Sequence, residues 1–235
     1  MSNQVITSFS RAGAEQCGER GVLSHVACWP CPVVVYLDEP MELPAECRAT
    51  GEIPGWRETA AVLPRTNPLA GKPTNYIWDA RRFAVKPFVW LNAAERMDAG
   101  ILTWLDGDTE TVKTVPASLP RMLLGEADVA YLGRGDMHPE TGVVVFRIPE
   151  ALPLLSWCRA MYQEGRFLKV ASGWTDCHVL RDGLRSVPIR ARDLTSHLAP
   201  AWTSKIDACE LSPIGSFVVH YKGQQRKREV ATWTH

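Results

Sequence analysis

Two aspartates stand one residue apart in the stretch WLDGDT, directly after a run of apolar residues. Asp106 and Asp108 repel each other at this spacing, and at the end of a buried strand their charges need a cation or hydrogen-bond donors. Hard divalent ions such as Mn²⁺ or Mg²⁺ prefer oxygen ligands, so the pair is a candidate metal site. Gly107, between them, leaves room for a phosphate group to approach. The competing interpretation is a solvated turn, for which DGDT is suitable.

Other residues that could act with the acid pair are spread along the chain. Arg82 and Lys86 lie four residues apart, so a helix would place both on one face, either to bind phosphate or as a solvated surface. His220 follows an apolar run and is either a neutral imidazole ligand or a satisfied core residue. Asp176 stands near the start of a helical pattern, either as a general base or as a helix-terminus acid, with His178 as the second candidate base.

The elements that must position these residues follow from the hydrophobic pattern. Short apolar runs predict strands at 4–9, 33–37, 100–105, 127–132, 142–148 and 215–223, and helical spacing predicts helices at 12–29, 79–97, 149–165 and 174–184. The alternation of strands and helices predicts an α/β domain with parallel strands. The acid pair then lies at the carboxyl end of a central strand, the edge where open α/β sheets bind ligands.

Two segments depart from a simple alternation. The helix at 79–97 has Asp79 in place to cap it, but it contains Pro87, which should kink it or shift its register. Residues 38–75 are rich in proline, glycine and charge, so we expect a loop with little regular structure there.

The composition limits the class of protein. Apolar residues make up 46% of 235 residues, which is enough for a folded core. Lys+Arg and Asp+Glu both total 26, which argues against a wholly basic nucleic-acid binder and leaves room for a local basic patch. We find neither an apolar run of about 20 residues nor a secretory signal, so we expect no membrane partner and a cytoplasmic location.

The pair Cys28 and Cys31, in CWPC, suggests a redox or metal site at first sight. The pair follows a helical pattern instead of starting a helix, and no second CxxC completes a zinc site. We interpret the cysteines as incidental reduced thiols.

Several stretches together resemble a known family. ILTWLDGDT resembles the Asp-x-Asp motif of glycosyltransferases with the A-type fold, in which a divalent metal bridges the acids to the diphosphate of a nucleotide sugar. VITSFSRAG is similar to the first nucleotide-binding strand and loop of that fold. YIWDARRFAVKPF resembles a helix of bacterial and phage-encoded glycosyltransferase-like proteins, and HYKG resembles the C-terminal His-x-x-Gly of glycogenin-like families. The likeness spans about residues 4 to 225.

This resemblance implies one Rossmann-like domain over residues 1–235, with a mostly parallel central sheet flanked by helices. Residues 1–132 would bind the nucleotide sugar, and residues 133–235 would form the acceptor side and a basic tail. The implied activity is that of a metal-dependent hexosyltransferase that uses Mn²⁺ or Mg²⁺ and a UDP-sugar donor.

The resemblance also implies roles for individual residues. The metal ligands would be Asp106, Asp108 and His220, and the catalytic residues would be Asp176 and Asp106. The expected donor contacts are Thr7, Ser8, Phe9, Asp79, Arg82, Lys86, Asp106, Lys222 and Gly223. Further candidates beside the site are Glu140, Trp78 and Trp174.

The acceptor is the least determined part of the prediction. Some phages glycosylate hydroxymethylated pyrimidines in their own DNA, so a phage-encoded enzyme would act in the host cytoplasm on a base flipped out of the duplex. Four basic residues in the tail would then contact phosphates, or simply form a solvated terminus: Lys222, Arg226, Lys227 and Arg228. A saccharide, lipid or protein hydroxyl stays open as acceptor. The alternative classes are a non-catalytic nucleic-acid-binding protein and a metal-dependent phosphoryl- or nucleotidyl-transfer enzyme.

Overall fold

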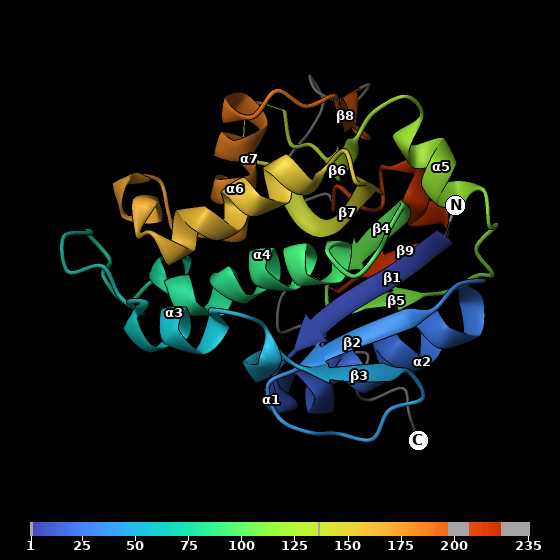
Figure 1. Cartoon of the computed structure of the whole chain (residues 1–235), viewed down its shortest axis with the longest axis horizontal. Coiled ribbons are helices and arrows are strands. Elements are labelled where there is room, and N and C mark those ends of the chain that lie inside the picture. The colour runs from blue at the N-terminus through green and yellow to red at the C-terminus, as the bar shows by residue number, and fades with distance from the viewer. Residues whose placement is uncertain (1, 136, 197–206, 222–235) are drawn as a thin grey trace.

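The structure, a computed structural model, describes residues 2–135, 137–196 and 207–221. Its main feature is a seven-stranded sheet in the order β3-β2-β1-β4-β7-β6-β8 (Figure 1). Its strands are β1 Ser2–Phe9, β2 Val33–Leu37, β3 Glu46–Ala49, β4 Gly100–Leu105, β6 Val129–Leu132, β7 Glu140–Ile148 and β8 Ala191–Asp193. Within this sheet β7 alone is antiparallel to its neighbours, β4 and β6. The predicted α/β fold with a mostly parallel central sheet is therefore confirmed.

The central strands are buried on both faces, as their nearly continuous apolar sequences require. Every residue of β2 and β4 is buried. Because side chains alternate along a strand, Leu102 and Trp104 of β4 join one hydrophobic cluster, while Ile101 and Leu105 join a second cluster on the opposite face.

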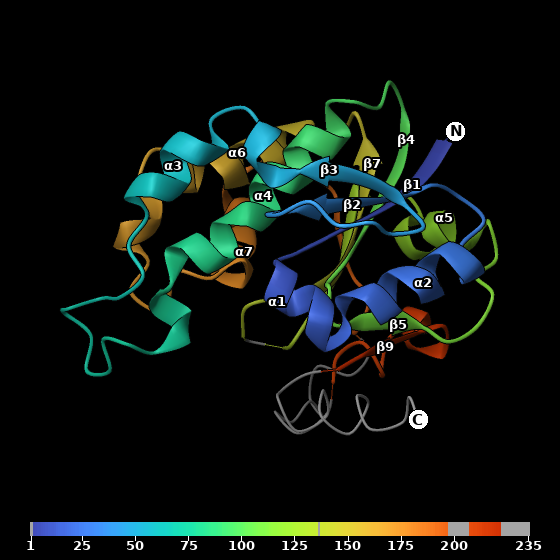
Figure 2. The ribbon, with the colours of Figure 1, turned by 90° about the horizontal axis from the view of Figure 1, so that it is seen from below.

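Helices cover both faces of the sheet, so the fold has three layers (Figure 2). One face carries α3 Trp56–Val62, α4 Ala80–Ala94, α6 Leu152–Gln163 and α7 Asp176–Ser186; the other carries α2 Glu19–Cys28 and α5 Leu119–Leu124. The short α1 Arg11–Gly13 and a π-helical turn, Ala14–Gly18, lead into α2. Short 3₁₀ turns lie at Thr50–Glu52, Tyr76–Trp78, Arg166–Lys169 and Pro213–Ser216. No helix among the described residues is long and apolar enough to cross a bilayer.

Helix α4 begins as its sequence predicts. Asp79 is the N-cap, and its carboxylate accepts a hydrogen bond from the backbone N–H of Arg82 at 3.2 Å. Asp79 also pairs with Arg65 at 3.1 Å. Pro87 lies inside the helix without ending it. The helix therefore continues far enough to cross the buried sheet.

The expectation of little regular structure at 38–75 is wrong for its middle half, residues 46–62. That half contains β3, a 3₁₀ turn and α3, which begins after Gly55 at a φ of 75°. These elements are short, and short helices depend on tertiary packing more than on local sequence. Trp56, for example, packs edge-to-face on Phe88 of α4, with ring centroids 5.3 Å apart.

A second, two-stranded sheet lies beside the first. It pairs β5 Thr109–Thr111 with β9 Val218–His220 in antiparallel register, so that Thr109 lies opposite His220. The predicted strand at 215–223 is thus present in shorter form, while β5 had no distinct sequence signal. This pairing brings the end of the described chain back to the segment that follows the acid pair.

His25 of α2 connects the two-stranded sheet to the helical layer through contacts with β5. Its Nδ1 lies 2.8 Å from the hydroxyl of Thr111, and its Nε2 lies 3.3 Å from the hydroxyl of Thr109. Trp29 Nε1 also donates to the hydroxyl of Thr111, at 2.9 Å. Burial lowers the pKa of His25 to about 3, so this histidine is neutral in the folded protein at pH 7.

This neutral histidine should make the protein less stable in mild acid. The unfolded state binds a proton at His25 near pH 6.5 and the folded state only near pH 3, so the free energy of unfolding falls as pH drops below 6.5. Between pH 6.5 and 5 the loss from this residue should be about 2 kcal/mol. Urea unfolding over this range would measure it. His25→Gln should lose that part of the slope, and an unchanged slope in the variant would contradict the assignment.

The cysteine pair at 28–31 behaves as an incidental pair. Cys28 ends α2, Cys31 precedes β2, and both are free thiols. Burial raises the pKa of Cys31 to about 11, with a backbone hydrogen bond from Val5 opposing it. A redox-active cysteine needs the opposite shift.

Candidate functional site

The chemically active residues gather at one edge of the main sheet. Asp106 and Asp108 follow the carboxyl end of β4, and because β7 is antiparallel, its first residues, Glu140 and Thr141, lie at the same edge. The backbone N–H of Asp106 donates to the carbonyl of Gly142 at 2.8 Å, which holds the two strand ends together. This is the edge at which the sequence predicts a ligand site.

Asp106, Asp108 and His220 form a group of potential metal ligands. One ligand atom from each residue lies within 4.8 Å of the others, and His220 Nε2 is 3.2 Å from Asp108 Oδ1. The side chains of Asp106 and Asp108 are 18% and 21% exposed, so an ion in solution can reach them. Two carboxylates and one imidazole suit Mn²⁺ or Mg²⁺, especially where phosphate oxygens complete the coordination. The structure therefore brings together the three predicted ligands, and the donor set fits the expected ion.

The electrostatics of this group favour a bound cation. Burial raises the pKa of Asp106; Lys86 opposes this, and the neighbouring charge of Asp108 adds to it. Burial would lower the pKa of His220, but the hydrogen bond and the charge of Asp108 outweigh burial and raise it. Both pKa shifts mean that added positive charge stabilises the cluster, and a proton or a metal ion can supply that charge.

Lys86 of α4 reaches into the same site as a half-buried cation. Its Nζ lies 2.7 Å from Asp106 Oδ1 and 2.7 Å from Asp176 Oδ2, and it donates to the hydroxyl of Thr141 at 3.2 Å. Burial opposes its charge, but Asp106 and Asp176 outweigh burial and raise the pKa of Lys86. The lysine is therefore a fixed positive charge beside the proposed metal ligands.

Asp176, the first residue of α7, lies behind Lys86 with its side chain 1% exposed. It also accepts a hydrogen bond from the hydroxyl of Thr141. Thr175, and not Asp176, is the N-cap of α7, because its side chain accepts from the backbone N–H of His178. The geometry places Asp176 where it holds Lys86, and its role as a base stays a prediction.

Arg82 and Lys86 lie four residues apart in α4, as helical spacing predicts, but of the two Lys86 is the one that contacts the acid pair. Arg82 is exposed, and its guanidinium lies 6.0 Å from the ring centroid of Tyr76 and 5.8 Å from that of Phe83. Arg82 lies one turn nearer the start of α4, where no contact joins it to the acid pair within the described residues. The prediction that Arg82 binds the donor has no support from this geometry.

The predicted donor contacts at the end of β1 are only partly accessible. Thr7 is 1% exposed with a buried hydroxyl, so its predicted contact with the donor gains no support from this geometry and stays a prediction. Ser8 and Phe9 are half-buried. A Cβ at Gly107 would lie 3.1 Å from the Phe9 ring and 3.2 Å from the carbonyl of Ser8. Gly107 is thus required first by the packing of the chain on itself, and not only by room for a phosphate.

The other predicted residues fall in two groups. Trp78 and Trp174 are buried and pack edge-to-face at 5.3 Å, so neither is available to stack on a ligand. Lys222 and Gly223 lie outside the described residues, as do the basic residues at 226–228.

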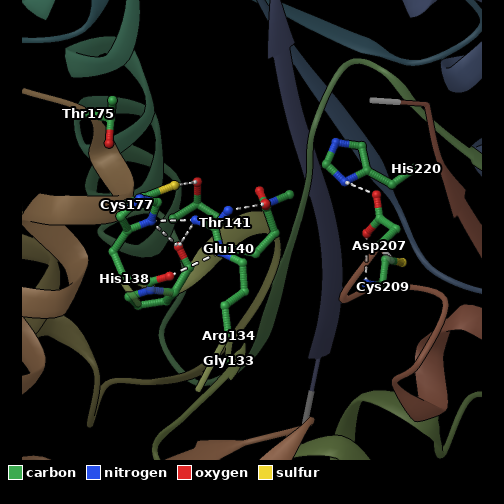
Figure 3. Close-up of polar contacts among 12 residues, drawn as sticks. Gly133, Arg134, His138, Glu140, Thr141, Thr175, Cys177, Asp207, Cys209 and His220 are labelled. Carbon is green, nitrogen blue, oxygen red and sulfur yellow. Dashed lines mark hydrogen bonds and ion pairs between the residues drawn. The ribbon is translucent and has the colours of Figure 1, made fainter. Parts of the chain in front are cut away.

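A second polar cluster borders Thr141 (Figure 3). Arg134 pairs with Glu140 at 3.4 Å and donates to the carbonyl of His138 at 3.0 Å. The ring centroids of His138 and His178 lie 4.3 Å apart. Burial lowers the pKa of His178 to about 4, with His138 adding to the effect, so this second candidate base is neutral and weak at pH 7. This cluster forms the side of the site opposite His220.

Besides Arg134 and His138, sequence reasoning missed three residues that lie against Asp106, Lys86 or His220. Trp104 Nε1 donates to Asp106 Oδ1 at 2.8 Å, and Thr141 joins Lys86 to Asp176. Asp207 Oδ2 lies 3.7 Å from His220 Nδ1. Trp104 was detectable, because residues two apart on a strand share a face. Thr141 and Asp207 had no local signal.

Gly142 should be required for the position of His220. An added Cβ would lie 2.5 Å from Cε1 and 2.7 Å from Nδ1 of that imidazole, whose side chain is only 4% exposed. We expect Gly142→Ala to displace the ring and to weaken Mn²⁺ binding by about tenfold or more, measured by calorimetry. Gly71→Ala is the matched control, because no atom lies within 4 Å of its added Cβ. Unchanged affinity in Gly142→Ala would show that His220 is not a ligand.

Comparison by sequence finds no relative: no protein-family model matches, and no curated protein matches. Comparison by structure finds many similar chains. A glycosyltransferase involved in glycosylation of the major capsid of PBCV-1 has a TM-score of 0.53 and 12% identity, covering 99% of this chain and 100% of that chain. Galactosyltransferase LgtC, in complex with donor and acceptor sugar analogs, has a TM-score of 0.56 and 13% identity, covering 98% and 95%. The bifunctional glycosyltransferase WbbM has a TM-score of 0.52 and 12% identity, covering 95% of this chain and 46% of that chain.

These likenesses extend over nearly the whole chain at very low identity, so what they show is the fold. The chain has the A-type glycosyltransferase fold, which confirms the fold expected from the sequence resemblance.

Proposed function

We propose that this protein is a metal-dependent glycosyltransferase that moves a hexose from a nucleotide sugar, with a UDP-sugar as the proposed donor, to a hydroxyl group. One observation carries the proposal: Asp106, Asp108 and His220 converge at the carboxyl edge of the parallel strands. The A-type fold supports it, because structures that share this fold include transferases such as LgtC. Fold alone would not suffice, since function depends on the site.

The residues of the chain have distinct proposed roles. The carboxylates of Asp106 and Asp108 and the Nε2 of His220 would hold the ion. A bound Mn²⁺ or Mg²⁺ would stabilise the negative charge on the departing nucleoside diphosphate. Trp104 and Lys86 both contact Oδ1 of Asp106, which leaves its other oxygen for the ion. Lys86 adds a second positive charge at the edge of the same site.

The remaining proposed roles concern the substrates. Ser8 and Phe9 would frame the nucleoside at the end of β1, and Lys222 and Gly223 would contact the diphosphate. Asp176 is the proposed base for an inverting reaction, in which its carboxylate would exchange Lys86 for the acceptor hydroxyl. A retaining reaction on one face of the sugar needs no such base, so the anomeric configuration of the product tests this role.

For the acceptor we propose a 5-hydroxymethylpyrimidine base in DNA. The basic sequence of the tail supports this choice, and so do Arg81 and Arg82, which are exposed in the first turn of α4. The same transfer to a saccharide, lipid or protein hydroxyl is the alternative, and the experiment below separates these acceptors.

The test is to incubate the protein with a panel of nucleotide sugars, Mn²⁺, and either ordinary or hydroxymethylcytosine DNA. Free nucleoside diphosphate and the mass of the digested nucleosides are then measured together. A hexose-sized gain only on the modified base would support both donor and acceptor. Diphosphate release without a DNA product would reject DNA as acceptor and retain the transferase.

Two other outcomes would point to different classes. Salt-sensitive DNA binding that Asp108→Asn leaves unchanged, without nucleotide-sugar turnover, would indicate a binding protein. A product that carries phosphate in place of sugar would indicate phosphoryl or nucleotidyl transfer.

A further inference from the structure

The imidazole of His220 is held on three sides. Its Nδ1 faces Asp207 Oδ2 at 3.7 Å (Figure 3). Its Nε2 faces Asp108 Oδ1 at 3.2 Å, and the backbone of Gly142 lies against the ring. The side chains of His220 and Asp207 are 4% and 3% exposed. Nδ1 is buried, and within the described residues it has no hydrogen-bond partner. Asp207 is therefore the acidic group that this nitrogen faces.

A histidine that binds a metal must present one nitrogen without its proton. In a neutral imidazole the other nitrogen then carries the hydrogen, and its acceptor determines which tautomer forms. Here Nε2 faces the cluster with Asp106 and Asp108, so the ligand tautomer carries its hydrogen on Nδ1. At 3.7 Å the contact with Asp207 is longer than a hydrogen bond, and a shift of about 0.8 Å would form one.

The carboxylate of Asp207 is itself fixed by the local backbone. Its Oδ1 accepts a hydrogen bond from the backbone N–H of Cys209 at 2.8 Å. Cys209 is fully buried, and its carbonyl accepts from the hydroxyl of Ser212 at 2.8 Å. The thiol of Cys209 also donates to the carbonyl of Val218 in β9, the strand that ends at His220. One oxygen of Asp207 therefore secures the turn, and the other is directed at the imidazole.

We propose that Asp207 is a positioning residue of the metal centre, whose carboxylate holds His220 in the tautomer with hydrogen on Nδ1 and leaves the Nε2 lone pair for the ion. The inference rests on the proposed metal site and deepens it, because it explains how a buried histidine is kept ready to bind. A purely structural role, in which Asp207 only secures the turn at Cys209, is the alternative.

Asp207→Asn separates these roles. An asparagine has the same shape, and its carbonyl oxygen can still accept from the N–H of Cys209. Its amide group then presents N–H to Nδ1 of His220, which favours hydrogen on Nε2, the wrong nitrogen for binding a metal. The variant should therefore keep the fold and reverse the tautomer.

The experiment uses the full chain with ¹⁵N-labelled histidine at about pH 9, well above the ordinary pKa of histidine. Long-range ¹H–¹⁵N spectra distinguish the protonated from the unprotonated ring nitrogen, and loss of one signal set in His220→Gln assigns His220. Without an ion, Nε2 donates to Asp108 at 3.2 Å, so the spectra are compared with MgCl₂ present. We then expect hydrogen on Nδ1 in the native protein and on Nε2 in Asp207→Asn. Calorimetric titration with MgCl₂ and MnCl₂ should show an affinity about tenfold to a hundredfold lower in Asp207→Asn.

Glu210→Gln is the control, because it removes an exposed acid from the same segment; tautomer and affinity should match the native protein. If Asp207→Asn keeps hydrogen on Nδ1 and native affinity, the proposal is wrong. If Asp207→Asn does not fold, the spectrum of the native protein with MgCl₂ still tests the proposal. Hydrogen on Nε2 of His220 in that spectrum would show that the proposal is wrong. If the native protein binds neither ion in the titration, the metal site itself fails; if it binds them and only Asp207→Asn is without effect, the failure is that of Asp207 alone.

Discussion

Replacing Asp108 with asparagine should reduce release of nucleoside diphosphate from the donor by a factor of about 10³ or more. The change removes one of two charged ligands and one partner of His220, which lies 3.2 Å away. An amide is a much weaker ligand for a hard divalent ion than a carboxylate. We expect Mn²⁺ affinity, measured by calorimetry, to fall together with turnover, and added Mn²⁺ to restore turnover only in part.

The same substitution should leave the fold intact. Asp108 is partly exposed, and its charge adds to the raised pKa of Asp106, so its removal relieves a repulsion. The free energy of unfolding should therefore change by no more than about 1 kcal/mol. Asp98→Asn is the matched control, because Asp98 is an exposed acid just before β4, at the opposite end of the same strand. Full metal-dependent turnover in Asp108→Asn would remove the basis of the proposed function.

The parts of this site that could be predicted are those with a local signal in the sequence. Asp106 and Asp108 follow an apolar run, and a strand that is buried on both faces has that pattern. His220 likewise ends a short apolar run. Lys86 lies on a helix with a clear cap at Asp79. In each case the residue type and the neighbouring strand or helix together indicate that the residue lies at the site.

The remaining parts depend on contacts between distant segments. His220 reaches Asp108 because β9 pairs with β5, and both of these strands are only three residues long. Helical spacing treats Arg82 and Lys86 alike, and only their position relative to the sheet edge makes Arg82 exposed and Lys86 half-buried. The need for glycine at 142 arises from the ring of His220, far away in sequence. No local pattern carries such information.

Lys86→Met should destabilise the protein by about 3–5 kcal/mol, because it removes the cation that the buried carboxylate of Asp176 shares with the half-buried carboxylate of Asp106. Asp106 and Asp176 each lie 2.7 Å from Nζ, and their side chains are 18% and 1% exposed. Methionine replaces most of the volume of the lysine, so the loss would report on charge more than on packing. Urea unfolding at pH 7 would measure it, with Lys113→Met, at an exposed lysine, as the control.

The pH dependence of this variant should identify the cause. Lys86 opposes the raised pKa of Asp106, so without the lysine that pKa rises further. An acid whose pKa is higher in the folded state than in the unfolded state binds its proton first in the folded state, so acidification stabilises the fold. The deficit of Lys86→Met should therefore shrink between pH 7 and about pH 5. A deficit that stays constant with pH would show that packing, and not charge, is what Lys86 contributes.

A second substitution completes this argument. Lys86→Met combined with Asp176→Asn removes one uncompensated charge and keeps the acceptor for the hydroxyl of Thr141. If the lysine acts by neutralising Asp176 as well as Asp106, the double variant should recover at least about 1 kcal/mol relative to Lys86→Met alone. If the losses in the free energy of unfolding from Lys86→Met and Asp176→Asn are strictly additive, Lys86 does not stabilise the charge of Asp176. The Asp176 carboxylate would then be free for the role of base.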